Sequence, residues 1–501
     1  MRAGKYILSI DQGTTSSRAI VFDAYGRNVG MAQREFTQYY PKPGYVEHDA
    51  VEILETVLYA MRQTVLEGGI SPKDIAALSI TNQRETVVAW DRKTGIPICN
   101  AIVWQCRRTA PLCEALKKKG LAEKIKETTG LVIDPYFSGT KMAWILNHVP
   151  KARELAAAKR LCMGTIDSWL IYSLTEGAVF VTDYSNASRT MLFDIHRLCW
   201  DEDLLQTLEI PKEVLPEVVS SSGIAGYCHE DVLGERIPIA GIAGDQHGAL
   251  FGQCCFSPGM VKNTYGTGCF VLMNTGEQAV ASKEGLLTTI AWGLDGKVTY
   301  ALEGSAFNAG SAIQWLRDEL GIIETAQECD RLAESVPDTG GVSFVPAFSG
   351  LGAPYWDMYA RGLLIGMTRG TGRPQICRAV LESIALESAD LMTVMQKESG
   401  LSLSVLRVDG GASRSRFLMQ YQADLLDAQV QRPGCPETTA LGSAMLAGLA
   451  VGVWQDQEEL SAIWQLQQVF EPQSDPENRK QAVQRWHEAV NRSRDWANPS
   501  Q

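Results

Sequence analysis

The sequence lacks the features of several large protein classes. No stretch of its 501 residues approaches the roughly twenty consecutive apolar residues that a membrane-spanning helix needs. The first apolar run ends at Asp11, which is too early for a signal peptide. Acidic residues outnumber basic residues by 58 to 46, and the resulting net charge of -12 argues against binding to nucleic acid or to an anionic membrane surface.

Short metal and nucleotide motifs are also absent from the sequence. The 12 cysteines are scattered without a Cys-x-x-Cys pair, which argues against a zinc site and against a disulfide framework. The 6 histidines form no His-Glu-x-x-His motif, and no P-loop sequence is present. We therefore expect a reduced, cytoplasmic protein that is neither a zinc protease nor a P-loop NTPase.

The chain is long enough to bury two hydrophobic cores. Apolar residues make up 45% and charged residues 21% of the sequence, as in ordinary soluble domains. A buried strand is expected to end at Asp245, and Ser257-Pro258-Gly259 then forms a turn. We predict two domains, residues 1–254 and 255–501.

Both halves open with the same pattern of strand, polar turn and strand. In the first half, strands over 6–10 and 18–23 precede a helix over 49–67 that Asp49 can cap. The second half repeats the pattern with strands over 260–265 and 269–273, and a helix is expected over 306–320. The pattern predicts an α/β fold with mixed sheets.

The first turn, Asp11-Gln-Gly-Thr-Thr-Ser-Ser-Arg18, is rich in hydrogen-bond donors. Its hydroxyls and backbone amides suit an anion, and a guanidinium can bind phosphate oxygens in a planar, bidentate way. An acidic residue in a phosphate site indicates a mediating Mg²⁺ ion, which prefers carboxylates and phosphate oxygens. An ordinary hydrophilic hairpin is the alternative for this turn alone.

Two further glycine-rich turns strengthen the phosphate interpretation. Thr264-Tyr-Gly266-Thr267-Gly268 opens the second half, and Asp409-Gly-Gly-Ala-Ser413 follows a later strand. The turn over 11–18 and the turn over 264–268, one at the start of each half, can hold a polyphosphate from both sides. Three such turns in this order resemble the actin-like ATPases, whose nucleotide lies in a cleft between two domains.

A more specific resemblance is carried by longer segments. The segment from Tyr136 to His148, and Gly362-Leu-Leu-Ile-Gly366 followed by residues 375–382, resemble the two signatures of the FGGY carbohydrate kinases. Residues 82–86, 101–109, 244–246 and 263–270 resemble the members of that family that phosphorylate glycerol. The resemblance implies two actin-like (ribonuclease H-like) domains, an interdomain active-site cleft, and glycerol, ATP and Mg²⁺ as ligands.

A small triol needs several hydrogen-bond partners and an apolar wall for its carbon atoms. Arg84 and Glu85 are expected to form a donor and acceptor pair. Asp245 is the candidate general base, whereas nothing nearby in the sequence orients His247 for that role. The complete predicted substrate set is Arg84, Glu85, Trp104, Tyr136, Asp245, Gln246 and Phe270. For the aromatic members, core packing is the alternative.

The family resemblance also implies a nucleotide site and a metal site. The nucleotide set is Thr14, Thr15, Ser16, Arg18, Thr267, Gly310, Gln314, Gly411 and Ser415, and Mg²⁺ is assigned to Asp11 and Asp245. We expect a homo-oligomer, either a dimer or a tetramer. Two alternatives stay open: a kinase of this family for another sugar or polyol, and an actin-like filament or chaperone ATPase.

Overall fold

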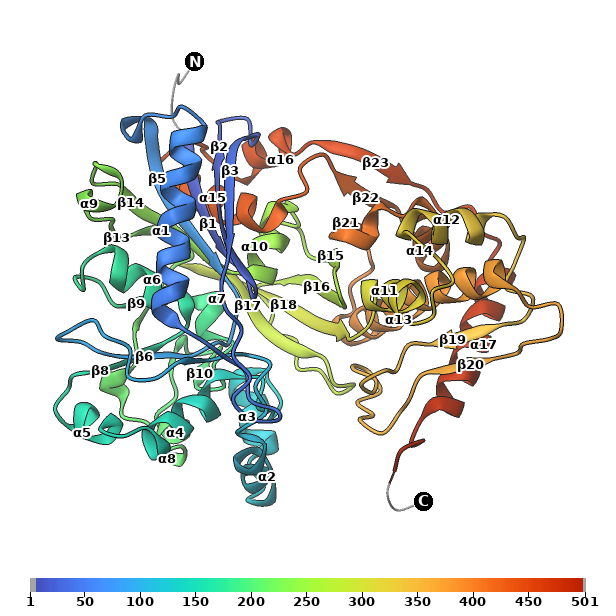
Figure 1. The fold of residues 1–501 in the computed structure, drawn as a ribbon, viewed down its shortest axis with the longest axis horizontal. Coiled ribbons are helices and arrows are strands. Elements are labelled where there is room, and N and C mark those ends of the chain that lie inside the picture. Colours follow the sequence, from blue (N-terminus) through green and yellow to red (C-terminus); the bar gives the residue numbers. More distant parts are fainter. Residues whose placement is uncertain (1–5, 499–501) are drawn as a thin grey trace.

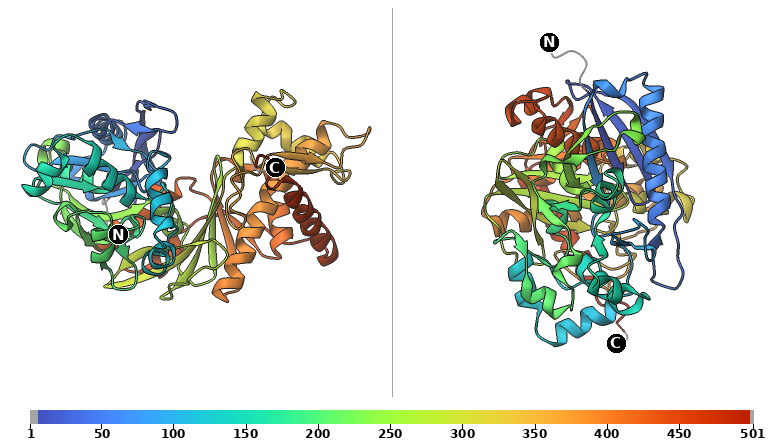
Figure 2. Two further views of the ribbon diagram at one scale, coloured as in Figure 1. Left: turned by 90° about the horizontal axis from the view of Figure 1, so that it is seen from below. Right: turned by 90° about the vertical axis from the view of Figure 1, so that its left-hand side faces the viewer.

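The protein, described here from a computed structural model, folds into two lobes that meet along extended strands (Figures 1 and 2). The structure describes residues 6–498. The ends of the two predicted domains, residues 1–5 and 499–501, lie outside the described residues. Within the described range, no helix combines the length and the apolarity that crossing a membrane requires.

A six-stranded mixed sheet forms the centre of the first lobe. Its strand order is β13-β14-β5-β1-β2-β3. β1 pairs antiparallel with β2 and parallel with β5, so a three-stranded meander is extended by later parallel strands. The strands are β1 (Tyr6–Gln12), β2 (Ser16–Phe22), β3 (Asn28–Glu35), β5 (Ile75–Asn82), β13 (Ser222–Tyr227) and β14 (Pro238–Gly244).

The second lobe is built on a seven-stranded sheet with the same plan. Its order is β17-β18-β16-β15-β21-β22-β23, and β15 pairs antiparallel with β16 and parallel with β21. The predicted α/β class and the duplication are therefore confirmed. The strands are β15 (Met260–Tyr265), β16 (Cys269–Gly276), β17 (Leu287–Leu294), β18 (Lys297–Ala306), β21 (Val405–Asp409), β22 (Val430–Pro433) and β23 (Leu466–Phe470).

Both faces of the first sheet are covered, as the side-chain alternation of β1 requires. Leu8 packs in a cluster with α1 (Ala50–Glu67), whereas Ile7 packs in another cluster with α15 (Thr438–Ala450). Asp49 caps α1 as predicted, with its carboxylate accepting from the Val51 backbone N–H. The side chain of Val51, in the first turn of α1, is exposed and does not take part in this packing.

α15 comes from the second half of the chain but covers the sheet of the first half. It packs on β14, β5 and β1 and lies against α10 (Asp245–Gly252). Gly442 and Gly252 lie at the contact between these helices, where a Cβ on either would collide with the other helix's backbone. The predicted boundary after Cys254 stays a prediction.

One predicted helix is shorter than expected. The helix expected over 306–320 begins only at Gly310, because β18 continues to Ala306, which pairs with Cys269 of β16. The helices of the second lobe are α11 (Gly310–Asp318), α12 (Ala326–Glu334), α13 (Arg373–Ser399), α14 (Arg416–Leu426), α16 (Gln457–Ile463) and α17 (Pro476–Ser493), and a small sheet pairs β19 (Ser343–Val345) with β20 (Leu363–Ile365).

The segment between β5 and β13 adds a mainly helical layer to the first lobe, shown in blue-green in Figure 1. Its helices are α2 (Ala110–Lys118), α3 (Ala122–Thr129), α4 (Ser138–His148), α5 (Ala152–Ala157), α6 (Ile166–Leu174), α7 (Tyr184–Ala187) and α8 (Glu202–Thr207), and α9 (Glu230–Leu233) follows β13. The short strands are β4 (Glu47–His48), β6 (Val88–Asp91), β7 (Ala101–Ile102), β8 (Leu161–Gly164), β9 (Val181–Asp183), β10 (Phe193–Asp194), β11 (Cys199–Trp200) and β12 (Glu217–Val219).

Candidate active site

The turn between β1 and β2 holds Arg18 between two carboxylates. Its guanidinium lies 2.6 Å from Asp11 Oδ2 and 2.8 Å from Glu437 Oε2, at the N-terminus of α15. The sequence predicted that Arg18 would face phosphate oxygens, whereas here both of these contacts are made to protein carboxylates. Burial raises the pKa of Asp11, and the neighbouring Arg18 opposes that rise.

The other members of this turn stay close to the junction of β1, β2 and β3. Ser16 Oγ accepts a hydrogen bond from Gln33 Nε2 at 3.0 Å, and the carbonyl of Thr15 accepts from the Phe36 N–H at 3.3 Å. Thr15 itself is exposed. A ligand at this turn therefore meets an exposed Thr15 next to a Ser16 that already has a protein partner.

Trp104 and Tyr136 form an aromatic wall beside the turn. Their rings lie edge to face with centroids 5.6 Å apart, and both side chains are only half-buried. Trp104 Nε1 donates to Thr14 Oγ1 at 3.0 Å. Trp104 was predicted to contact the substrate and Thr14 to contact phosphate, and the two residues are in direct contact. The partial exposure of Trp104 and Tyr136 leaves ring surface for a ligand.

Four buried charged side chains lie behind this wall. Arg84 donates to both carboxylate oxygens of Glu303, at 2.6 and 3.1 Å, and Arg189 Nη2 lies 3.0 Å from Glu303 Oε1. Glu85 pairs with Arg189 Nε at 2.6 Å, whereas it is 3.9 Å from Arg84 Nε. Arg84 and Glu85 are therefore within ion-pair distance of each other, as expected, but each also has a closer partner of opposite charge.

Glu303 lies on β18 of the second lobe, whereas its two arginines belong to the first lobe. Burial alone would raise the pKa of Glu303, but Arg189 and Arg84 hold it well below its usual range. Burial would lower the pKa of Arg84, but Glu303 raises it on balance. A buried ion pair costs desolvation, so this contact is better suited to fixing geometry than to adding stability.

Asp245 is the first residue of α10, where β14 ends against Arg84. Its Oδ1 lies 3.1 Å from Arg84 Nε, and 32% of its side chain remains accessible to a substrate. A Cβ on Gly244 would lie 2.7 Å from Arg84 Cγ, so glycine permits this close approach. Burial raises the pKa of Asp245, and Arg84 opposes the rise.

Asp11 and Asp245 are the two carboxylates that the sequence analysis assigned to Mg²⁺. Burial is the main cause of the raised pKa of Asp245, and the charge of Asp11 also contributes to that rise. A divalent cation between them would offset this repulsion, and carboxylate oxygens are the ligands that Mg²⁺ prefers. The donor set therefore suits the predicted ion.

His247, which the sequence analysis rejected as the general base, is held by a residue that is distant in the sequence. It is fully buried, and its Nε2 lies 3.1 Å from Thr289 Oγ1 on β17. Burial lowers its pKa well below the usual range, so the imidazole is neutral at physiological pH.

The predicted nucleotide residues of the second lobe lie at the second turn and in the segments next to it. The Gly310 N–H donates to Gly266 O at 2.9 Å, and the Ala309 N–H donates to Thr267 O at 2.8 Å. These bonds tie the turn between β15 and β16 to the start of α11, and Gln314 follows one turn later on that helix. A Cβ on Gly310 would lie 2.7 Å from Gly266 O, so this position requires glycine.

Gly411 and Ser415 lie beyond β21, next to the same turn. The neighbouring Gly410 has a φ of +86°, and a Cβ there would lie 2.5 Å from Tyr265 O. The backbone at Gly411 is open, because a Cβ added there would have no neighbouring atom within 4 Å. Ser415 caps α14 and also donates to Asp330 Oδ1 at 2.6 Å, so its hydroxyl is already paired.

Gln246 and Phe270 lie where the two lobes meet. Both contact Lys262, whose ammonium donates to Gln246 Oε1 and, at 3.4 Å, to Phe270 O. Lys262, Arg189 and Glu303 were not identified from the sequence. The signal for two of them was a charged residue inside an otherwise apolar strand, as in Tyr300-Ala-Leu-Glu303 and Met260-Val-Lys262.

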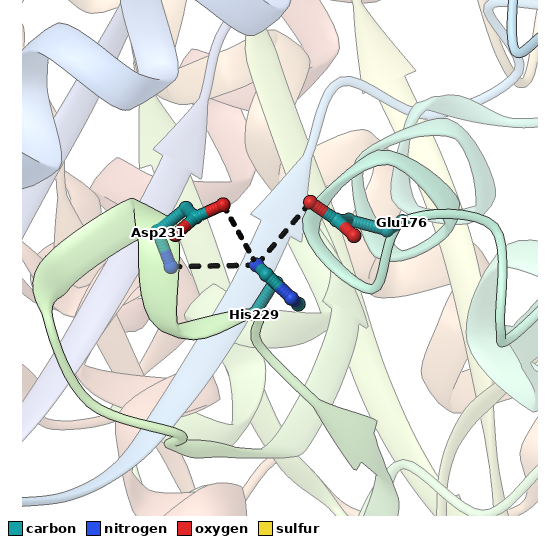
Figure 3. Close-up of side chains that lie close together, drawn as sticks. All are labelled: Glu176, His229 and Asp231. Carbon is teal, nitrogen blue, oxygen red and sulfur yellow. Dashed lines mark hydrogen bonds and ion pairs between the residues drawn. The ribbon is translucent and has the colours of Figure 1, made fainter.

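A separate group of polar side chains lies on the first lobe, outside this junction (Figure 3). His229 Nδ1 lies 3.2 Å from Glu176 Oε1 and 3.4 Å from Asp231 Oδ2. The two carboxylates are exposed, and His229 caps the four-residue helix α9. This exposed arrangement does not contact the residues predicted from the sequence.

Comparison with known proteins places the chain in a family. The model of the FGGY carbohydrate kinase N-terminal domain matches residues 6–252, and the model of the C-terminal domain matches residues 261–451. The chain belongs to the FGGY family of carbohydrate kinases. The predicted resemblance is confirmed.

Individual relatives agree over nearly the whole chain. Glycerol kinase 2 of Thermotoga maritima is 61% identical over 492 residues, which cover 98% of this chain and 99% of the relative. Glycerol kinase of Caldanaerobacter subterraneus is 59% identical over 493 residues, with 98% and 99% coverage. The crystal structure of Plasmodium falciparum glycerol kinase with ADP superposes with a TM-score of 0.93 at 37% identity and covers 98% of both chains.

The fold extends to kinases with other names. Xylulose kinase of Lactobacillus acidophilus superposes with a TM-score of 0.87 at 24% identity, covering 97% of this chain and 98% of the other. At this identity the likeness shows the fold alone. The predicted two-domain fold of the family is confirmed.

Proposed function

We propose that the protein is a glycerol kinase, which transfers the γ-phosphoryl group of ATP to a terminal hydroxyl of glycerol to give sn-glycerol 3-phosphate and ADP. The observation that carries this proposal is the position of Asp245. This partly accessible carboxylate lies 3.1 Å from Arg84 Nε and within electrostatic range of Asp11 in the β1–β2 turn. The relatives named glycerol kinase support the choice of acceptor.

Asp245 accepts the proton of the attacking hydroxyl. A carboxylate is suited to this step because its ionised form accepts a proton and because phosphoryl transfer needs mainly positioning and charge stabilisation. The ring surfaces of Trp104 and Tyr136 face the carbon atoms of glycerol, and Arg84, Glu85 and Gln246 bind its hydroxyls. Phe270 is the last member of the proposed substrate set. It lies on β16, and its carbonyl accepts a hydrogen bond from Lys262, which also donates to Gln246.

Two hairpin turns bind the nucleotide from opposite lobes. The first provides Thr14, Thr15, Ser16 and Arg18, and the second provides Thr267 with Gly310 and Gln314 of the adjoining helix. Gly411 and Ser415 contribute from the loop after β21, where the open backbone at Gly411 permits close approach of a flat group. Arg18 must exchange a carboxylate partner for phosphate when ATP binds.

Asp11 and Asp245 would hold the Mg²⁺ ion that accompanies ATP. The ion neutralises negative charge on the phosphate oxygens when it is bound. Its presence also relieves the repulsion between the two carboxylates. We further propose that the protein acts in the cytoplasm as a homo-oligomer.

The experiment that tests this function is a coupled assay of ADP formation with ATP, Mg²⁺ and a panel of acceptors. We expect glycerol to give the highest kcat/KM, above xylulose, gluconate and erythritol. The main competing function is a kinase for one of these longer acceptors, and a higher kcat/KM for that acceptor would establish it. ATP hydrolysis that is indifferent to every acceptor would point instead to an actin-like ATPase.

A further inference from the structure

A fully buried lysine lies between the two lobes. Lys262 is on β15, and its side chain has no accessible surface. Its Nζ donates to Thr264 Oγ1 at 2.8 Å, to Phe270 O at 3.4 Å and to Gln246 Oε1. All three protons of the ammonium therefore have an acceptor.

These acceptors belong to two different parts of the proposed site. Gln246 follows Asp245 on α10 of the first lobe, and α10 packs against β15 and β16. Thr264 and Phe270 pair across β15 and β16, immediately beside the turn that contains Thr267. One ammonium group thus connects the acceptor side of the site to the phosphate-binding turn.

The charges around Lys262 are those of the proposed reaction centre. The pKa of the Lys262 ammonium is raised by the negative charges of Asp409, Asp245 and Glu303. The positive charge of Arg84 lowers it. Burial nevertheless lowers the pKa of Lys262 to about 8. A buried cation is costly, and an apolar side chain of similar length would fill the same space without that cost.

The other fully buried lysine with a lowered pKa has a different setting. Lys141 Nζ donates to the carbonyls of Tyr136 and Phe137, both of which lie just before its own helix α4. That contact is local and joins residues of one lobe. Lys262 differs because its partners come from both lobes.

We propose that Lys262 is a positioning residue for phosphoryl transfer. Its ammonium fixes the amide of Gln246 and the hydroxyl of Thr264 relative to each other, so that the acceptor alcohol and the phosphate-binding turn keep the spacing that in-line transfer requires. This inference rests on the proposed function. It adds a residue that the sequence did not identify.

The test compares Lys262→Met with the unsubstituted enzyme and with the matched surface variant Lys297→Met. Lys297 is on the same sheet, and its side chain is 78% exposed. For Lys262→Met we expect kcat to fall about tenfold to a hundredfold and the KM for glycerol to rise, because a misplaced reactant loses rate steeply. The Kd for ADP should change less than about threefold, since the backbone bonds between the turn and α11 remain.

A second variant separates positioning from packing. Lys262→Ala leaves space for a small amine, so ethylammonium should raise its kcat at least about fivefold, whereas tetramethylammonium, which has no N–H donor, should not. Both variants are first checked for a cooperative thermal transition. A folded Lys262→Ala that does not respond to ethylammonium would overturn the proposal.

The two proposals fail in different ways. If the unsubstituted enzyme lacks glycerol-dependent ADP formation, the proposed function is wrong. If the unsubstituted enzyme is active and Lys262→Met keeps both kcat and the KM for glycerol within about threefold, only the role of Lys262 is wrong.

Discussion

Trp104 Nε1 donates a hydrogen bond to Thr14 Oγ1 over 3.0 Å, and this bond joins the aromatic wall to the turn between β1 and β2, which is proposed to bind phosphate. The two residues are 90 positions apart in the sequence. Any movement of the turn on nucleotide binding would therefore act on the ring that is proposed to face the acceptor. Binding of ATP and binding of glycerol are expected to be coupled through this contact.

Thr14→Val tests that coupling, because it keeps the side-chain shape but removes the hydroxyl acceptor. The KM for glycerol should rise about fivefold, which corresponds to the loss of one hydrogen bond of about 1 kcal/mol. Trp104→Phe should have a similar effect, and the double variant should be no worse than either single variant. Additive effects, measured as kcat/KM for glycerol in a double-mutant cycle, would show that the two residues act independently.

Asp245→Asn should nearly abolish turnover. Asparagine keeps the size of the side chain but cannot accept the hydroxyl proton, so we expect kcat to fall about 10²–10⁴-fold. The Kd for ADP, measured by calorimetry without glycerol, should stay within about threefold of the original value. Retained turnover in Asp245→Asn would rule out this carboxylate as the general base.

Glu303→Gln should weaken both the fold and the acceptor site. It leaves Arg84 and Arg189 buried with too little negative charge, and breaking a buried ion pair in this way costs on the order of 3–5 kcal/mol. Urea unfolding monitored by circular dichroism would measure this loss, with a rise in the KM for glycerol beside it. Glu277→Gln is the matched control, since Glu277 is 78% exposed and its contact with Lys297 is 3.5 Å long. An equal effect of both substitutions would contradict the role of Glu303.

Local signals in the sequence predicted the fold well. Apolar runs separated by polar, glycine-containing turns located β1, β2, β15 and β16, and the Asp49 cap located the start of α1. The end of β18 was missed because Ala306 extends a ladder whose partner, Cys269, lies 37 positions earlier in the chain. Strand pairing of this kind depends on long-range contacts, which local patterns do not contain.

The same limit applied to the candidate site. Arg84 and Glu85 were found because they follow a strand in a recognisable segment, but their partners Glu303 and Arg189 are 219 and 104 positions away. Glu303 on β18 and Lys262 on β15 are single charged residues in apolar strands. No residue close to either of them in the sequence indicates what it contacts. The packing of one lobe on the other brings Glu303 to the two arginines, whereas Glu85 and Arg189 meet through the fold of the first lobe.

A buried carboxyl on α13 gives the protein a pH-dependent stability. Glu387 is 2% exposed, and its Oε2 has no hydrogen-bond partner among the described residues. Burial, and next the charge of Asp390, raise its pKa from 4.5 to about 8. Asp390 accepts hydrogen bonds from Trp486 Nε1 at 2.6 Å and from His487 Nε2 at 2.8 Å. These two donors therefore stabilise the Asp390 carboxylate and leave Glu387 Oε2 without a partner among the described residues.

The folded protein therefore keeps the Glu387 proton to a higher pH than the unfolded chain does. Its contribution to stability is fully present below pH 4.5 and is lost as the pH rises through about 8, because the folded state binds more protons in that window. The glutamine in Glu387→Gln cannot ionise. The free energy of unfolding of this variant, minus that of the unsubstituted protein, should therefore increase by on the order of 1 kcal/mol per pH unit between pH 5.5 and 7.5. Urea unfolding at these pH values measures the difference, with Glu334→Gln, on the exposed side of α12, as the control. A difference that does not change with pH would mean that Glu387 is already ionised in the folded protein.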